Sequence, residues 1–518
     1  MSVQVSFPGV YIQEVPSGVH TITGVATSIT AFVGRAYKGP TDEAVTITSN
    51  ADFERIFGGL SRNSTMSYAV RQFFQNGGSQ AIIVRVADRT AAATSAATID
   101  LGTGTTLVAA SIGTWGRNLV ATVRSDTKDP TDPDLFNLIL FDDPTIKLDA
   151  EGRGGSGLRE TFLNVSVNSA SPRFVTKILE QQSQLARVTA TGANAPLPTP
   201  AVNASATSGN DGGDLVDSDI EGVEANKTGI FALEKADLFN LLVIPPLTPG
   251  ASGTDVAIAS TWTTAADYCE RRRAFLIVDA PRVWTVSTGG NAATTSIGGF
   301  SAIVRKNAAL YFPRLLLSDP LQDGNLEEFA PSGVIAGLMS RIDSSRGVWK
   351  APAGIEANLE GVSNLTINMT DKENGLLNPL GINCVRNFSG IGIVCWGART
   401  LEGQDILASE WKYVPVRRLA LFLEESLFRG TKWVVFEPND EPLWAKIRLN
   451  LNAFMMSLFR QGAFQGTTPD KAFFVKCDAE TTTQNDRNLG IVNIEVGFAP
   501  LKPAEFVIIK IQQIVGDL

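Results

Sequence analysis

Few residues in this 518-residue chain have the types and spacing that catalysis requires. His20 is the one histidine, so a Ser-His-Asp or Cys-His mechanism would have to recruit it from near the N-terminus. Two carboxylate groups resemble the acid pair of a glycosidase: Glu424 with Glu425, and the group from Glu437 to Glu441. The first falls inside an expected helix and the second in a turn. We therefore favour surface roles for both and expect no catalytic residue.

The sequence offers little to a metal ion or a cofactor. Asp129, Asp132 and Asp134 could hold calcium, because hard cations bind clustered carboxylates, but the interleaved prolines and the missing distal glutamate favour a solvated turn. No phosphate-binding GxxxxGK[ST] loop occurs. The four cysteines form no CxxC pair and are expected to be free, buried thiols: Cys269, Cys384, Cys395 and Cys477. We expect no metal and no cofactor.

Composition limits the class of protein. Hydrophobic residues make up 44% of the chain and charged residues 19%, as in ordinary soluble globular proteins. The net charge of -9 argues against a general nucleic-acid binder. The first residues show neither the basic nor the apolar region of a signal peptide, so we expect none, and no apolar run approaches the ~18 residues of a membrane helix. We expect a protein made in the cytoplasm that does not insert into membranes.

The elements that would position any site alternate between helix and strand. The N-terminal part predicts a buried strand at 27–35, a helix at 50–57 capped by Asn50, a helix at 67–76 and a strand at 81–86. After Asp88 the sequence becomes all-β in texture, which indicates a β-rich insertion.

From residue 226 the mixed pattern returns. The continuous apolar runs at 239–244 and 274–279 are typical of strands in a sheet covered on both faces. Residues 308–317 predict another strand, and 255–273 and 332–342 predict helices. The predicted fold class is mixed α/β: an inner α/β core domain built from N- and C-terminal parts, an inserted β-rich outer domain and extended terminal arms.

The C-terminal region predicts a short buried strand at 433–436, helices at 415–430 and 443–461, and three later strand-like runs. The helix at 443–461 carries Lys446, Arg448 and Arg460 away from its apolar face. No acidic residue occurs between Pro442 and Asp470. This helix is either a core helix with solvated basic residues or a surface that docks an acidic partner.

Two predicted strands have no partner nearby in the sequence. The N-terminal strand contains Val10, Ile12 and Val15, and the C-terminal strand contains Val507, Ile509 and Ile511 in alternation with polar residues. Because a strand needs a partner at its edges or a cover, each must pair inside its own domain or with another copy of the chain.

Several long stretches resemble contractile-tail sheath proteins, the family of phage tail sheaths and of the sheaths of related injection particles. These stretches are FPGVYIQEVPSG near the N-terminus, YVPVRRLALFLEESLFRGTKWVVFEPNDEPLWAKI, FFVKCD and PLKPAEFVIIKI. The resemblance covers the first ~90 residues and about 225–518.

The resemblance implies a structural subunit. It would form stacked six-fold rings around an inner tail tube protein, in a helical assembly of identical subunits bounded by baseplate and terminator proteins. Contraction would drive the tube through a target envelope. In the family each terminal arm adds a strand to a neighbour's sheet, and the inner domain touches the tube, so Lys446, Arg448 and Arg460 become candidates for the tube contact.

The resulting division of the chain is an N-terminal arm at 1–25, core regions at 26–90 and 223–400, a β-rich peripheral insertion at 91–222, a C-terminal inner domain at 401–500 and a C-terminal arm at 501–518. The localisation it implies is a phage tail or a contractile injection particle. Two other functions stay open: a static shell or surface-layer lattice, and an envelope-glycan enzyme within the insertion.

Overall fold

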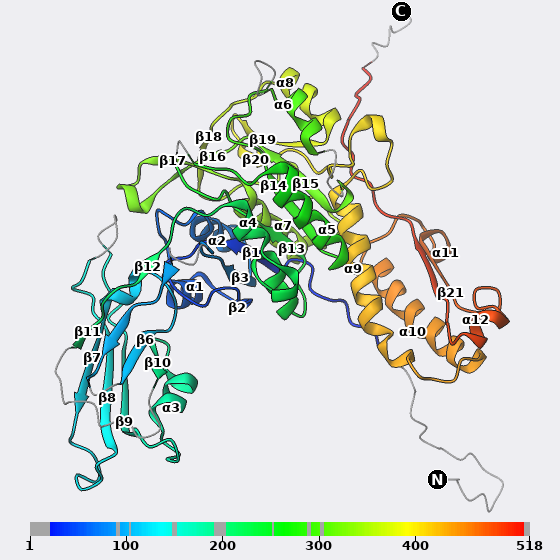
Figure 1. Cartoon of the computed structure of the whole chain (residues 1–518). Helices are drawn as coiled ribbons and strands as arrows, with labels where there is room; N and C mark the ends of the chain where they lie inside the picture. The colour runs from blue at the N-terminus through cyan, green and yellow to red at the C-terminus, as the bar shows by residue number, and fades with distance from the viewer. Residues whose placement is uncertain are drawn as a thin grey trace, which may run out of the picture. The chain divides into compact units, whose positions relative to one another are not determined.

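The computed structural model describes most of the chain, in two compact units (Figure 1). The described residues are 21–89, 94–102, 105–147, 153–190, 204–250, 253–286, 292–300 and 305–511. The central unit comprises Thr27–Arg346 and Lys350–Arg417. The C-terminal unit comprises Met1–Ala26, Gly347–Trp349 and Arg418–Leu518.

An eight-stranded sheet organises the central unit. Its strands, in spatial order, are β2 (Val45–Ile47), β3 (Ala81–Arg85), β1 (Thr30–Gly34), β13 (Leu241–Val243), β14 (Phe275–Asp279), β15 (Ala308–Phe312), β19 (Ile382–Phe388) and β20 (Gly392–Cys395). The six strands from β3 to β19 are parallel, and the two outer strands are antiparallel. The chain order reverses between β1 and β13, so the sheet is doubly wound and has a topological switch point there.

Both faces of this sheet are covered, as the continuous apolar runs predicted. Ala31 and Val33 belong to the cluster beneath α5 (Thr263–Arg271) and α4 (Asp217–Glu221). The alternate residue Phe32 contacts Phe73 of α2 (Thr65–Gln75), with ring centroids 5.5 Å apart. Helix α7 (Ser332–Arg346) packs beside α2. The mixed α/β class is therefore confirmed.

Three local predictions need correction. Helix α1 (Asn50–Phe57) begins after Ser49, not at an Asn50 cap, because the Ser49 side chain accepts a hydrogen bond from the Asp52 N–H (3.1 Å). A π-helical turn, Ile258–Trp262, precedes α5 and replaces the first half of the helix expected at 255–273. Because Pro313 has no N–H for a ladder, the run at 308–317 divides into β15 and β16 (Leu315–Ser318).

The β-rich insertion forms its own apolar core, which includes Trp115 and Phe136. Its strands are β4 (Thr94–Ser95), β5 (Thr98–Asp100), β6 (Thr106–Ala109), β7 (Leu119–Arg124), β8 (Leu135–Asp142), β9 (Arg159–Ser166), β10 (Ala186–Ala190), β11 (Ala204–Ser205) and β12 (Asn210–Asp211), with helix α3 (Val175–Gln182). The main sheet runs β11-β7-β8-β9 and is antiparallel.

A few polar contacts join the insertion to the core. Arg85 of β3 is buried and donates to the carbonyls of Ala36 and Gly39 in the core and of Ile112 in the insertion. Arg153 lies over the ring of Tyr37, 4.0 Å from its centroid. The remaining elements of the central unit are β17 (Leu326–Phe329), β18 (Val362–Leu365), α6 (Ala293–Ser296) and α8 (Asp371–Leu377).

The C-terminal unit packs two long helices with a two-stranded sheet. Helix α9 (Val414–Gly430) enters it after Arg417, and α10 (Glu441–Arg460) follows. Strands β21 (Phe473–Lys476) and β22 (Glu495–Phe498) are antiparallel, and the short helices α11 (Pro469–Ala472) and α12 (Gln484–Asn488) flank them. The α10 residues predicted as apolar are buried in one cluster: Trp444, Ile447, Leu451, Phe454, Met455 and Leu458.

The strand predicted at 433–436 is wrong. The chain instead makes a 3-10 turn, Lys432–Val434, and leaves Val435 and Phe436 exposed. The apolar letters of this stretch resemble a buried strand, but no neighbouring strand is available to pair with it in the described part of the unit. Among the described helices, none is long and apolar enough to span a bilayer.

Candidate assembly surface

The residues first considered for chemistry lie apart from one another. His20 lies outside the described residues, as do Val10, Ile12 and Val15. Asp129 accepts hydrogen bonds from Thr131, so it serves its own turn. Glu425 pairs with Arg429 along α9 at 2.6 Å. In the part of the chain that the structure describes, no group of three potential ligands is arranged to hold a metal ion.

The four cysteines are free and buried. Burial disfavours the thiolate and raises the pKa of Cys384 and of Cys395 to about 12, and that of Cys477 to about 11. At neutral pH these thiols are therefore protonated and behave as small apolar side chains.

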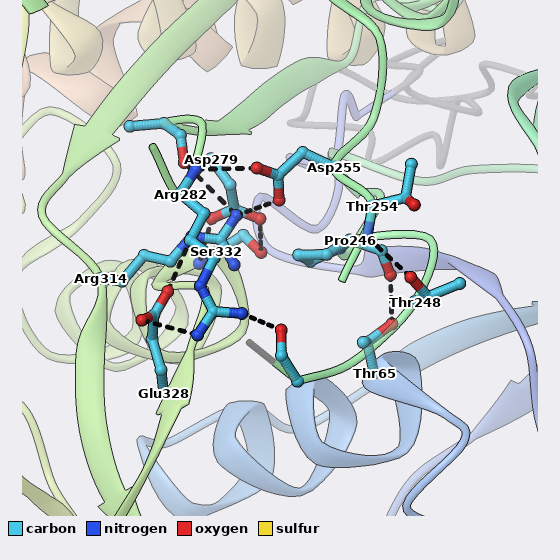
Figure 2. A network of polar contacts seen from close by, with 12 residues as sticks. Thr65, Pro246, Thr248, Thr254, Asp255, Asp279, Arg282, Arg314, Glu328 and Ser332 are labelled. Carbon is cyan, nitrogen blue, oxygen red and sulfur yellow. Dashed lines mark hydrogen bonds and ion pairs between the residues drawn. The ribbon is translucent and has the colours of Figure 1, made fainter. Parts of the chain in front are cut away.

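A network of ion pairs crosses the carboxyl edge of the central sheet (Figure 2). Arg314, which follows β15, pairs with Asp255 and lies 3.7 Å from Glu328 of β17. Arg282, which follows β14, pairs with the other oxygen of Glu328 at 3.1 Å, and its main-chain N–H donates to Asp255 at 2.7 Å. Figure 2 shows these side chains converging from separate loops.

Asp279, at the end of β14, lies beneath this network. Its carboxylate accepts hydrogen bonds from the main-chain N–H and the Oγ of Ser332 at 2.9 and 2.7 Å. It therefore satisfies a main-chain N–H that has no partner within the first turn of α7. Burial raises the pKa of Asp279 to about 6, although the Ser332 hydrogen bonds and Arg314 oppose the rise. The group is therefore a buried carboxyl whose charge costs stability near neutral pH.

The network lines one side of a cavity of about 390 Å³. In open α/β sheets this edge is where ligands usually bind. Here the arginines are neutralised by Asp255 from a neighbouring loop and by Glu328 from strand β17. Chemically, the arrangement ties the loops after β13, β14 and β15 to the β17 strand, which holds the core as one body.

The C-terminal segment is the main exposed feature. Residues 501–511 have no strand or helix assignment, and Phe506, Val507, Ile508, Ile509 and Ile511 are 72–93% exposed. The sequence predicted alternation, with one polar face, but both faces of the described segment carry apolar side chains. Soluble monomers rarely expose so much contiguous apolar surface, which indicates an interaction site.

The sheet of the C-terminal unit is also incomplete by itself. It has two strands, β21 and β22, in the described residues. Two-stranded sheets are marginally stable alone, and their edges present unpaired N–H and C=O groups that accept further strands. Phe474 on β21 is half exposed. The unit therefore has both an exposed apolar segment and a sheet able to accept one.

The chain next to the N-terminal arm is firmly anchored. Ile22 is buried in the core of the C-terminal unit, and a side chain at Gly430 of α9 would collide with it. The main-chain N–H of Val25 donates to the Oγ of Ser426 at 3.2 Å. A strand that precedes residue 21 would therefore start from a fixed point on α9.

The three basic candidates on α10 separate into two kinds. Lys446 and Arg460 are exposed, and neither makes an ion pair within the described residues. Arg448 is half buried, pairs with Glu441 at 2.5 Å and donates to the carbonyl of Cys477. Arg448 is therefore occupied within its own subunit. Sequence spacing placed it away from the apolar face of α10 but could not show the Cys477 carbonyl beside it.

Sequence reasoning missed two further residues. Asn450 is buried on α10, on the apolar side of the helix, and Phe436 is fully exposed at the preceding turn. A polar residue within the apolar stripe was the available signal for Asn450. For Phe436 no local signal existed, because the same letters fit a buried strand.

Comparison with known proteins identifies the family. Residues 225–401 match the phage tail sheath protein central domain, and residues 408–514 match the phage tail sheath C-terminal domain. The tail sheath protein of Vibrio phage KVP40 is 29% identical over 179 residues, which are 34% of this chain. The matched region spans only 25% of that longer relative.

Two solved structures share the fold across nearly the whole chain. The sheath complex of an extracellular contractile injection system, PVC, in its contracted state has a TM-score of 0.58 at 23% identity and covers 99% of both chains. The sheath tail protein from Listeria innocua has a TM-score of 0.60 at 13% identity and covers 93% of this chain and 96% of its own. With both of its conserved domains matched, this chain belongs to the phage tail sheath protein family.

Proposed function

We propose that this chain is the structural subunit of a contractile sheath, which polymerises as stacked rings around an inner tube and contracts to drive that tube through a target envelope. The family match supports this role. The carrying observation on the molecule itself is the exposed apolar segment at 506–511, in a unit whose described residues form a sheet of two strands.

In this proposal the C-terminal arm, 501–518, adds a strand containing Val507, Ile509 and Ile511 to the sheet of a neighbouring subunit. The N-terminal arm, 1–25, adds Val10, Ile12 and Val15 in the same way. Strand addition supplies main-chain hydrogen bonds along the whole edge. The anchored root at Ile22 lets an arm transmit force to its own subunit while the bodies rearrange.

The remaining regions take supporting roles. The core regions at 26–90 and 223–400 form the rigid body of the ring. The insertion at 91–222 is peripheral apart from α4, which packs in the central core. The inner domain at 401–500 faces the tube, with Lys446 and Arg460 as the contacts. We assign Arg448 to the support of α10, because its guanidinium is already paired with Glu441. Six-fold ring symmetry, a tube protein, a baseplate and a terminator complete the proposed particle.

Electron microscopy of the purified assembly tests the function. We expect hollow cylinders in two states, a longer, narrower one and a shorter, wider one, and conversion of the first into the second by mild denaturant. A static shell or surface layer would instead keep one lattice under the same treatment. Release of sugars from envelope glycans by the purified assembly would support an enzyme in the insertion instead.

A further inference from the structure

A pocket of about 430 Å³ lies in the C-terminal unit, between α10, Phe422 of α9 and the N-terminal residues 21–25. The α10 wall is a stripe of residues three or four apart: Asn450, Ala453, Phe454, Ser457, Leu458 and Gln461. The rings of Phe422 and Phe454 lie 6.2 Å apart. The pocket is therefore largely apolar and large enough for an aromatic side chain.

The side-chain amide of Asn450, at this pocket, has no hydrogen-bond partner among the described residues. The residue is 2% exposed, and in the described part of the chain neither its Oδ1 nor its Nδ2 has a hydrogen-bond partner. An unpaired buried amide destabilises the folded chain, and a leucine would fit this apolar stripe without that cost. One donor and one acceptor side by side match the C=O and N–H of a peptide main chain.

Phe436 has the complementary properties. Its side chain is fully exposed (104%), and its backbone is left-handed, with φ at 70°, which a bulky residue rarely adopts. Within the described residues, neither its main-chain N–H nor its C=O takes part in a hydrogen bond. Strain and exposure combined at one aromatic residue indicate a contact that the isolated subunit does not make.

Phe436 does not fill the pocket of its own subunit, since it is fully exposed. It precedes Glu441, the first residue of α10, whereas Asn450 lies nine residues further, ~14 Å along the helix axis at about 1.5 Å per residue. A contact between two different patches of identical subunits is head-to-tail and continues from copy to copy.

We propose that Phe436 of one subunit inserts into the Asn450 pocket of the next subunit. Its ring packs against Phe422 and Phe454, and its main-chain N–H and C=O pair with the Asn450 amide. The amide atoms are closed to solvent in the isolated subunit, so the Asn450 side chain has to turn toward the pocket when Phe436 enters it. The inference rests on the proposed sheath function, which requires an open-ended contact of this kind.

Disulfide trapping tests the contact directly. Phe436→Cys and Ala453→Cys variants are mixed under mild oxidant; the four native thiols are buried and do not compete. We expect a disulfide-linked dimer from the mixture and none from either variant alone. Replacing Ala453→Cys by Leu449→Cys, an exposed position on the same helix, is the matched control and gives no dimer.

The inference is overturned if the Phe436→Cys and Ala453→Cys variants form no disulfide-linked dimer in either soluble or assembled protein. Trapping of Ala453→Cys by Ile508→Cys, which would make the C-terminal segment the occupant of the pocket, overturns it as well. If sheaths with two states form but the Phe436 cross-link does not, the proposed function stands and this contact is refuted. Cylinders with one fixed lattice that do carry the cross-link refute the proposed function and keep the contact.

Asn450→Leu separates pairing from packing. Removal of the unpaired amide is expected to raise the melting temperature of the isolated subunit, while the concentration required for assembly rises about tenfold, as a loss of about 1.4 kcal/mol gives. Phe436→Gly relieves the strain of the left-handed backbone and removes the ring. We therefore expect the same two changes, a higher melting temperature of the subunit and a higher concentration required for assembly. Ile355→Ala, a similarly exposed apolar position, serves as control. Unchanged assembly of Asn450→Leu would contradict the pairing.

Discussion

Strand β15 of the central sheet, AALYF, and residues 506–511 of the C-terminal unit, FVIIKI, are similarly apolar but have opposite environments. Every residue of β15 is buried, between parallel neighbours on both sides. The second segment pairs with no strand among the described residues and is 72% or more exposed at each of its five apolar side chains. Folding of one chain thus uses the first strand and leaves the second uncovered.

The two regions contribute to different free energies, that of subunit folding and that of subunit association. Burial of a large apolar side chain is worth about 1.5–3 kcal/mol, so β15 contributes to folding of the subunit. The same favourable free energy at 506–511 is available only when another surface covers it, and part of it offsets the loss of motional freedom on association. In the proposed sheath, the first region resists unfolding and the second drives polymerisation.

Deletion of residues 506–518 is expected to have the largest effect. The described part of this segment makes no strand pairing within its own chain, so the truncated subunit should remain folded and soluble but form no sheath. Thermal unfolding and sedimentation measure the two properties on one sample. Sheaths assembled from the truncated chain would falsify the proposed strand donation.

A pair of alanine substitutions sharpens the same contrast. Leu310→Ala in β15 removes a fully buried side chain and should cost about 2–5 kcal/mol of unfolding free energy, by transfer and cavity formation. Ile509→Ala, at an exposed position, should change that free energy by less than about 0.5 kcal/mol, yet raise the concentration required for assembly. Denaturant titration separates them. Equal losses of stability in both variants would contradict the comparison.

The carboxyl edge of the central sheet should respond to pH. Asp279 has a pKa raised to about 6, above its ordinary 3.8, so between these values the folded chain binds more protons than the unfolded one. Its contribution to stability is therefore full below about pH 4 and is lost as pH rises through 6. In Asp279→Asn the amide oxygen can still accept from the Ser332 N–H, while its NH2 donates to the Ser332 Oγ. The variant should raise stability at pH 7.5 by on the order of 2–3 kcal/mol.

Urea titrations of Asp279→Asn at several pH values check this effect. The variant should lose the fall in stability that this carboxyl imposes as pH rises from about 4 through 6. Asp323→Asn, at an exposed carboxyl, is the control. A stability profile unchanged by Asp279→Asn would show that the carboxyl is not protonated in that range.

The smallest effect per subunit is expected at the tube-facing positions. Exposed ion pairs contribute roughly 0.2–1 kcal/mol each, so Lys446→Glu with Arg460→Glu should leave subunit stability unchanged. Repeated over all subunits, the loss should favour contracted or tube-free sheaths, counted by electron microscopy, over extended filled ones. Lys372→Glu, an exposed lysine of the central unit, is the control. A normal yield of extended, tube-filled particles would exclude Lys446 and Arg460 as the contacts.

Periodicity in the sequence determined the central strands of the main sheet and the longer helices. Continuous apolar runs identified β3 and β14 nearly to their ends, and helical spacing identified α9 and α10, because burial on one or both faces imposes a repeat that the residues must follow. The C-terminal apolar segment was also evident, though not its exposure on both faces.

Tertiary structure decided the features that no periodic pattern in the sequence encodes. Separate loops and strand β17 converge at one sheet edge and bring together Arg282, Arg314, Asp255 and Glu328. Such ion pairs leave no pattern in the local sequence. Phe436 is exposed because residues 433–436 pair with no strand in the part of the chain that the structure describes. The unpaired amide of Asn450 required the coordinates as well, since a partner can come from any part of the chain and only its absence marks the residue.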